Sequence, residues 1–136
     1  MTYLLEPAIG VCRFSFCGKG DWRSSRAAQT PEEIDALRRD NAAILYAPER
    51  MALRFHLFEN FLLPSLRGQT DSNFICLILT SDLMPQIYRD RLAVLCADVP
   101  QLELLVSSEV TVHNALWPRL AALNTAAGGP LVNFRI

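Results

Sequence analysis

Polar side chains at the ends of apolar stretches are the best candidates for chemistry in this sequence. Arg13 and Ser15 lie late in the apolar stretch 8–16, and Asp82 follows the apolar stretch 74–80. A buried charge is costly unless it is paired. We therefore expect Arg13 either to face a phosphate or a base at the mouth of a strand or to pair with a structural carboxylate.

Ser15 and Asp82 each have a functional and a structural interpretation. The Ser15 hydroxyl would sit at the same strand mouth as Arg13, where it could reach a nucleotide or simply face solvent. Asp82 could contact a nucleotide, or its carboxylate could stabilise the positive end of the helix dipole at the start of the next helix.

Other reactive residues favour structural roles. His56 and His113 have no carboxylate or cysteine at ligand spacing. The glycines around Lys19 lack the G-x-x-x-x-G-K-[ST] spacing of a phosphate-binding loop. The four cysteines form no C-x-x-C pair and fall mainly in apolar segments, where they behave as small hydrophobes. We expect reduced structural thiols at Cys12, Cys17, Cys76 and Cys96.

Alternating strand and helix patterns must position these side chains. We expect strands over 8–16, 74–80, 102–106 and 130–136. Thr30 and Pro31 are typical of a helix start, and this helix should reach about Asn41. Further helices should begin at Pro48 and Pro85 and cover about 114–127, with Pro64 ending or kinking the second one. Residues 17–29 are expected to form a polar loop.

This alternation predicts an α/β fold with a Rossmann-like, mostly parallel sheet flanked by helices, and a single domain over residues 1–136. In open α/β sheets the binding site lies at the carboxyl ends of the strands. The final stretch 130–136 would therefore deliver its last residue to that edge.

Composition and charge narrow the classes of partner. The chain of 136 residues is 51% hydrophobic and 20% charged, as in a globular domain, and its formal net charge is -1. This balance predicts no binding to nucleic acid, which requires a basic face. The N-terminus lacks the features of a signal peptide, and no apolar run approaches the roughly 20 residues of a membrane span. We expect the protein to be cytoplasmic.

The most specific segment is Ser65-Leu-Arg-Gly-Gln-Thr-Asp-Ser-Asn-Phe74. It is similar to the S-[LI]-x-x-Q-T-x-x-x-[FW] segment that joins the first helix to the second strand in many GT-A-type glycosyltransferases. The stretches 10–15, 45–50 and 88–92, with Phe58-Glu59, resemble more narrowly a bacterial rhamnosyltransferase family. The resemblance covers nearly the whole chain.

The resemblance implies the N-terminal half of a GT-A domain that binds a nucleoside-diphosphate sugar and transfers the sugar to an unknown acceptor, such as a glycan. It suggests an acidic nucleotide contact near Asp82, although strict alignment places Thr80 and Ser81 at those positions. Arg119 is similar in placement to a helix arginine that faces the pyrophosphate. The full family enzyme is expected to use Mg²⁺ or Mn²⁺ bound by an acidic segment after the fourth strand.

The chain ends before that acidic segment, so we expect this chain alone to bind no metal, to contain no catalytic residue and to be inactive by itself. The alternative is a non-catalytic, truncated fragment that binds a nucleotide or only self-associates through an exposed strand, because unpaired strand edges favour association. An unrelated flavodoxin-like interaction domain is a third possibility, which the Gln69-Thr70 segment argues against.

Overall fold

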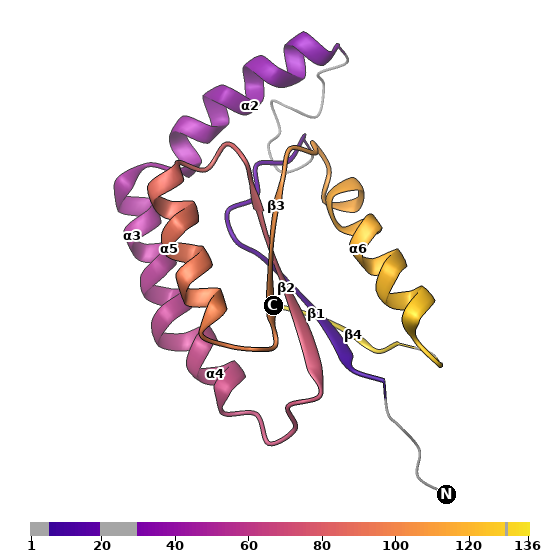
Figure 1. The fold of residues 1–136 in the computed structure, drawn as a ribbon. Helices are drawn as coiled ribbons and strands as arrows, with labels where there is room; N and C mark the ends of the chain where they lie inside the picture. Colours follow the sequence, from indigo (N-terminus) through magenta and orange to yellow (C-terminus); the bar gives the residue numbers. More distant parts are fainter. Residues whose placement is uncertain (1–5, 20–29, 130) are drawn as a thin grey trace, which may run out of the picture.

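A sheet of four parallel strands runs through the centre of the protein (Figure 1). The computed structural model describes residues 6–19, 30–129 and 131–136. The elements follow in the order β1 (Ala8–Arg13), α2 (Pro31–Leu45), α3 (Pro48–Leu57), the π-helix η2 (Phe58–Leu62), α4 (Leu63–Arg67), β2 (Phe74–Ser81), α5 (Gln86–Ala97), β3 (Leu102–Ser107), α6 (Val112–Ala126) and β4 (Asn133–Arg135).

The strand order is β3-β2-β1-β4, and every pairing is parallel. Ala8 pairs with Phe74 at the start of β1 and β2, and Ile9 pairs with Asn133 where β4 joins β1. Helices α2 to α5 lie on one side of the sheet in Figure 1 and α6 lies on the other. The predicted α/β, Rossmann-like fold with a parallel sheet and flanking helices is therefore confirmed.

Two hydrophobic clusters fill the spaces between the sheet and its helices. The larger one contains Met51 and Phe55 of α3 together with Leu92 of α5, all fully buried. The smaller one joins Leu77 of β2 to Leu116 of α6. β2 is buried almost throughout because it has a strand on each side and helices above and below, as its continuous apolar run predicted.

The first strand is shorter than expected, because β1 ends at Arg13 and not at Phe16. Ser15 has a φ of 50°, in the left-handed region, so the backbone turns away from the sheet there. Arg13 is the last residue of β1 and is exposed. β4 is also shorter than the stretch 130–136, of which Pro130 lies outside the described residues.

Helix α2 begins where the sequence predicted, because the Thr30 hydroxyl accepts a hydrogen bond from the Glu33 backbone N–H. It extends to Leu45, one turn beyond the expected end at Asn41, because Asn41 and Leu45 are both buried and hold the last turn in place. Most of the polar loop expected over 17–29 lies outside the described residues.

Pro64 does not end the helix that begins at Pro48, contrary to one of the two expectations. The chain continues through η2 into α4 as far as Arg67. Pro64 has no N–H, and its ring would collide with the carbonyl four residues earlier in a regular α-helix. The wider π-turn relieves this conflict, since the Leu63 N–H bonds to the Phe58 carbonyl five residues back. The extra residue also turns Leu63 into the core and leaves Leu62 only partly buried.

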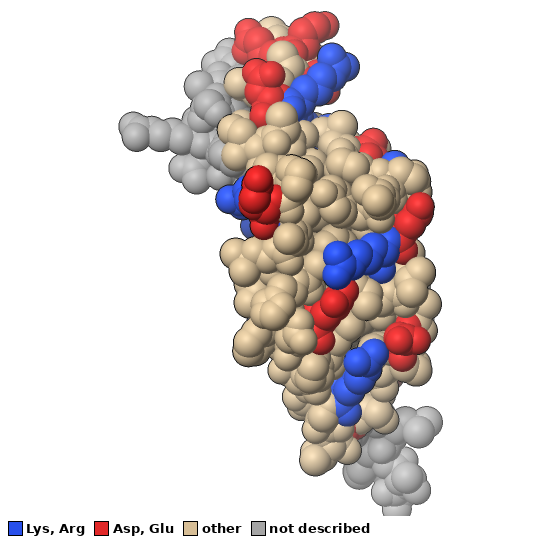
Figure 2. All heavy atoms as spheres, turned by 90° about the vertical axis from the view of Figure 1, so that its left-hand side faces the viewer, with Lys and Arg blue, Asp and Glu red and all other residues tan. Residues whose placement is uncertain are grey.

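Charges of both signs are interspersed over the face formed by the helices α2 to α5 (Figure 2). Two ion pairs lie on these helices, Arg91 with Glu59 at 2.7 Å and Arg67 with Asp98 at 3.6 Å. Exposed pairs of this kind contribute about 0–1 kcal/mol each. This face therefore owes its position to the buried apolar residues beneath it.

Candidate functional site

The strand order places a topological switch point between β1 and β4. The chain moves outward from β1 to β2 and β3 and then returns to the other side of β1 to form β4. Connections that leave in opposite directions open a crevice at the carboxyl ends of the two strands, where open α/β sheets bind ligands. The tertiary structure therefore identifies this edge of the sheet as the candidate site.

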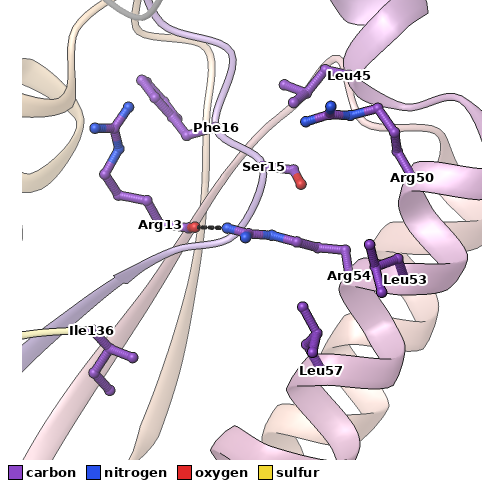
Figure 3. Close-up of a pocket in the computed structure, with 9 residues that line it drawn as sticks. All are labelled: Arg13, Ser15, Phe16, Leu45, Arg50, Leu53, Arg54, Leu57 and Ile136. Atoms are coloured by element: carbon purple, nitrogen blue, oxygen red, sulfur yellow. Dashed lines mark hydrogen bonds between the residues drawn. The ribbon is translucent and has the colours of Figure 1, made fainter.

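A pocket of about 610 Å³ lies at this edge (Figure 3). It is bounded by the end of β1, the residue that follows β4 and one face of α3. Three of its nine lining residues are arginines and none is acidic, so it favours an anionic ligand. The lining residues are Arg13, Ser15, Phe16, Leu45, Arg50, Leu53, Arg54, Leu57 and Ile136.

The α3 helix brings two of the arginines to the pocket. Arg50 and Arg54 lie four residues apart and therefore share one face of the helix. The Arg54 Nη2 donates a hydrogen bond of 2.5 Å to the Arg13 carbonyl, and the guanidinium lies 5.6 Å from the centre of the Phe14 ring. In Figure 3 the side chains of Arg50 and Arg54 reach toward the end of β1, whereas the Arg13 side chain is directed away from them.

Ser15 enters the pocket from the turn that ends β1 (Figure 3). Its left-handed backbone conformation costs about 1–2 kcal/mol in a residue other than glycine. The buried Tyr46 hydroxyl donates a hydrogen bond of 2.8 Å to the Ser15 carbonyl and so supports this conformation. Burial raises the pKa of Tyr46, so the phenol keeps its proton and remains a donor.

Ser81 and Asp82 lie at the end of β2, outside the lining of this pocket. Ser81 is fully buried, and its hydroxyl accepts a hydrogen bond of 2.8 Å from the Cys17 backbone N–H. Asp82 is 46% exposed and lies 4.0 Å from the Nη2 of Arg38. Arg38 is buried on α2 and donates from Nε to the Cys17 carbonyl at 3.2 Å. These four residues connect the ends of β1 and β2 to α2.

Arg119 lies on α6 and forms a two-point ion pair with Glu103 of β3. Its Nη2 and Nε lie 2.6 and 2.8 Å from the two carboxylate oxygens. Hydrogen bonding to this carboxylate raises the pKa of Arg119. Arg119 does not line the pocket at the switch point, and its predicted contact with a pyrophosphate stays a prediction.

The structure thus brings two of the five predicted site residues, Arg13 and Ser15, into one pocket and leaves the other three outside its lining. Sequence reasoning missed Arg50 and Arg54, although their spacing of four residues just after Pro48 was a usable signal. It also missed Arg38, because its burial depends on contacts with Cys17 and Asp82, which are distant in the sequence.

The four cysteines are free and buried, as predicted. Within the three described ranges, no group of three or more histidine, cysteine, aspartate or glutamate residues could hold a metal ion. The Mg²⁺ or Mn²⁺ expected from the family resemblance stays a prediction.

The comparisons with known proteins place the chain in a family. No helix among the described residues is long and apolar enough to cross a membrane. No curated protein and no solved structure matches the chain. Residues 7–136 match the family described as "Putative rhamnosyl transferase", and the chain therefore belongs to this transferase family.

Proposed function

We propose that this chain binds the nucleoside-diphosphate sugar donor of a glycosyltransferase, with activated rhamnose or a related deoxyhexose as the sugar. Membership of the transferase family supports a sugar donor and an acceptor. The observation that carries the proposal is the arginine-lined pocket at the β1–β4 switch point. A nucleoside diphosphate is an anion and is therefore attracted to an arginine-lined pocket. The pocket lies at the carboxyl ends of parallel strands, where open α/β sheets bind their ligands.

We further propose that the sheet corresponds to the first half of a GT-A domain. The Gln69-Thr70 segment lies between α4 and β2 and so directly precedes the second strand, as in the resemblance, although α4 is not the first helix of the chain. In this arrangement Ser15 and Arg13 contact the nucleotide at the end of β1, and Asp82 accepts a hydrogen bond from the base at the end of β2. The half-exposed carboxylate of Asp82 is accessible for this contact.

In this proposal the residues act by binding and orientation. Arg38 and Ser81 each form a hydrogen bond with the Cys17 backbone, and these bonds hold the segment after β1 against the end of β2. The Tyr46 hydroxyl keeps the Ser15 turn in its left-handed conformation. A pocket whose groups are already in place loses less entropy when the donor binds. Mg²⁺ or Mn²⁺, where an enzyme of this family binds it, would supply further positive charge for the diphosphate.

Calorimetric titration of the chain with UDP and dTDP, with and without Mn²⁺, tests donor binding. We expect micromolar binding that weakens in Asp82→Ala and in Arg13→Ala. Arg67→Ala is the matched control, because it removes an equal charge from the end of α4, outside the pocket lining. Failure of both nucleotides to bind under either condition would refute the proposal.

The sugar is tested separately from the nucleotide. Competition of dTDP-rhamnose against dTDP-glucose should favour the rhamnose donor if the family resemblance extends to the sugar. Equal affinity for the two would remove the rhamnose assignment and leave the nucleotide assignment in place.

A further inference from the structure

The two pocket arginines on α3 form a pair of like charges with no carboxylate beside them in the lining. Arg50 has no hydrogen-bond or ion-pair partner among the described residues. Arg54 donates to the Arg13 backbone carbonyl and lies over the Phe14 ring, and neither contact involves a carboxylate. By contrast, Arg91, Arg67 and Arg119 each pair with a carboxylate. Arg50 and Arg54 thus keep their positive charge available to a ligand.

The pair is mounted on a rigid element. Met51 and Phe55, which alternate with the two arginines along α3, are fully buried in the larger core cluster. The helix therefore cannot rotate without loss of core packing. The hydrogen bond from Arg54 to the Arg13 carbonyl and its position over the Phe14 ring further restrict that guanidinium. A guanidinium carries five N–H donors, so the remaining ones can still bind a ligand.

The shape of the site indicates the chemistry of the ligand. Planar guanidinium groups bind phosphate oxygens with two parallel hydrogen bonds. Two such groups, one helical turn apart, can each take one phosphate of a diphosphate. Figure 3 shows the Ser15 side chain between them, where its hydroxyl can donate a further hydrogen bond. Leu53 and Leu57 contribute apolar, solvent-exposed surface to the same wall.

We propose that Arg50 and Arg54 form a diphosphate subsite that binds its ligand without a metal ion. This inference rests on the proposed function and adds the group recognised and the residues that recognise it. Because the two guanidinium groups themselves supply the positive charge, binding through this pair should persist when a chelator removes metal ions.

The probes are inorganic pyrophosphate, UDP, UMP and uridine, titrated calorimetrically in EDTA at fixed ionic strength. We expect pyrophosphate and UDP to bind, and UMP to bind at least tenfold more weakly than UDP. Arg50→Ala and Arg54→Ala should each weaken UDP at least tenfold, and the double variant more. Arg54→Lys should rescue only partly, because a lysine lacks the planar fork. Arg67→Ala should leave every affinity unchanged.

Arg50→Ala is the decisive variant, because Arg50 has no hydrogen bond or ion pair among the described residues whose loss would destabilise the fold. Arg54, by contrast, also supports the end of β1. Thermal melts verify that each variant is folded. Unchanged UDP affinity in folded Arg50→Ala and in the double variant would overturn the subsite and leave the proposed function intact. Pyrophosphate binding that depends on both arginines, together with no added affinity for UDP or a sugar nucleotide, would retain the subsite and refute the proposed function.

Discussion

Replacement of Gly10 by alanine tests how β4, and with it one wall of the pocket, is attached to the sheet. A β-carbon at position 10 would lie 2.9 Å from Cε1 of the Phe134 ring and closer still to Cε2 and Cζ. Ordinary carbon–carbon contacts are about 3.5–4.0 Å, so the ring must move by roughly 1 Å or more. That movement also disturbs its edge contact with Phe74, whose ring centre is 6.3 Å away.

We expect Gly10→Ala to lower the free energy of unfolding by about 1–3 kcal/mol, the usual cost of overpacking. For a domain of this length that corresponds to a fall in Tm of roughly 3–10 °C. Urea denaturation measures the change. Gly129→Ala is the matched control, since a β-carbon there meets nothing within 4 Å, and it should change stability by less than about 0.5 kcal/mol.

The same variant should loosen β4 locally. The Ile9 N–H bonds to the Val132 carbonyl at 2.8 Å, and the Ile136 N–H bonds to the Val11 carbonyl at 3.0 Å. Both amides should exchange hydrogen faster in Gly10→Ala. Adding Phe134→Ala removes the ring that the new β-carbon meets, so the double variant should recover part of the lost stability. Wild-type stability with both amides still protected would refute the proposed packing of Phe134 on Gly10.

Two further predictions concern buried polar groups. Tyr46→Phe should lower the free energy of unfolding by about 1–3 kcal/mol, because the Ser15 carbonyl loses its buried donor. Tyr88→Phe should lower it by under about 0.5 kcal/mol, since the hydroxyl of this half-buried residue has no hydrogen bond among the described residues; equal effects in urea denaturation would contradict this. Burial raises the pKa of the Cys76 and Cys96 thiols to about 12 from an ordinary value of 9.0, so folded thiols keep their protons where unfolded ones lose them. The free energy of unfolding should therefore fall as pH rises from about 9 to 12, less steeply in Cys76→Ala/Cys96→Ala; an equally steep fall in this variant would refute the assignment.

Local signals in the sequence predicted those elements whose structure depends mainly on their own residues. The cap at Thr30 and the apolar run of β2 needed no distant partner to be recognised. The expectation that Pro64 ends the helix was wrong, because proline rules describe a regular α-helix. Here the packing of Leu63 and Leu66 in the core stabilises a π-turn that accommodates the proline ring. The end of β1 was misjudged because nothing local marks Ser15 for a left-handed conformation, which depends on Tyr46.

The sequence by itself determined that the chain alternates strands and helices, that its cysteines are structural and that Arg13 and Ser15 lie at a strand mouth. These features follow from periodicity and composition, which are local. Only the tertiary structure decided that β4 joins the free side of β1, that Arg50 and Arg54 face that junction, and that Arg119 instead pairs with Glu103. A site between segments far apart in the chain depends on strand order and helix rotation, and both are set by core packing across the whole sheet.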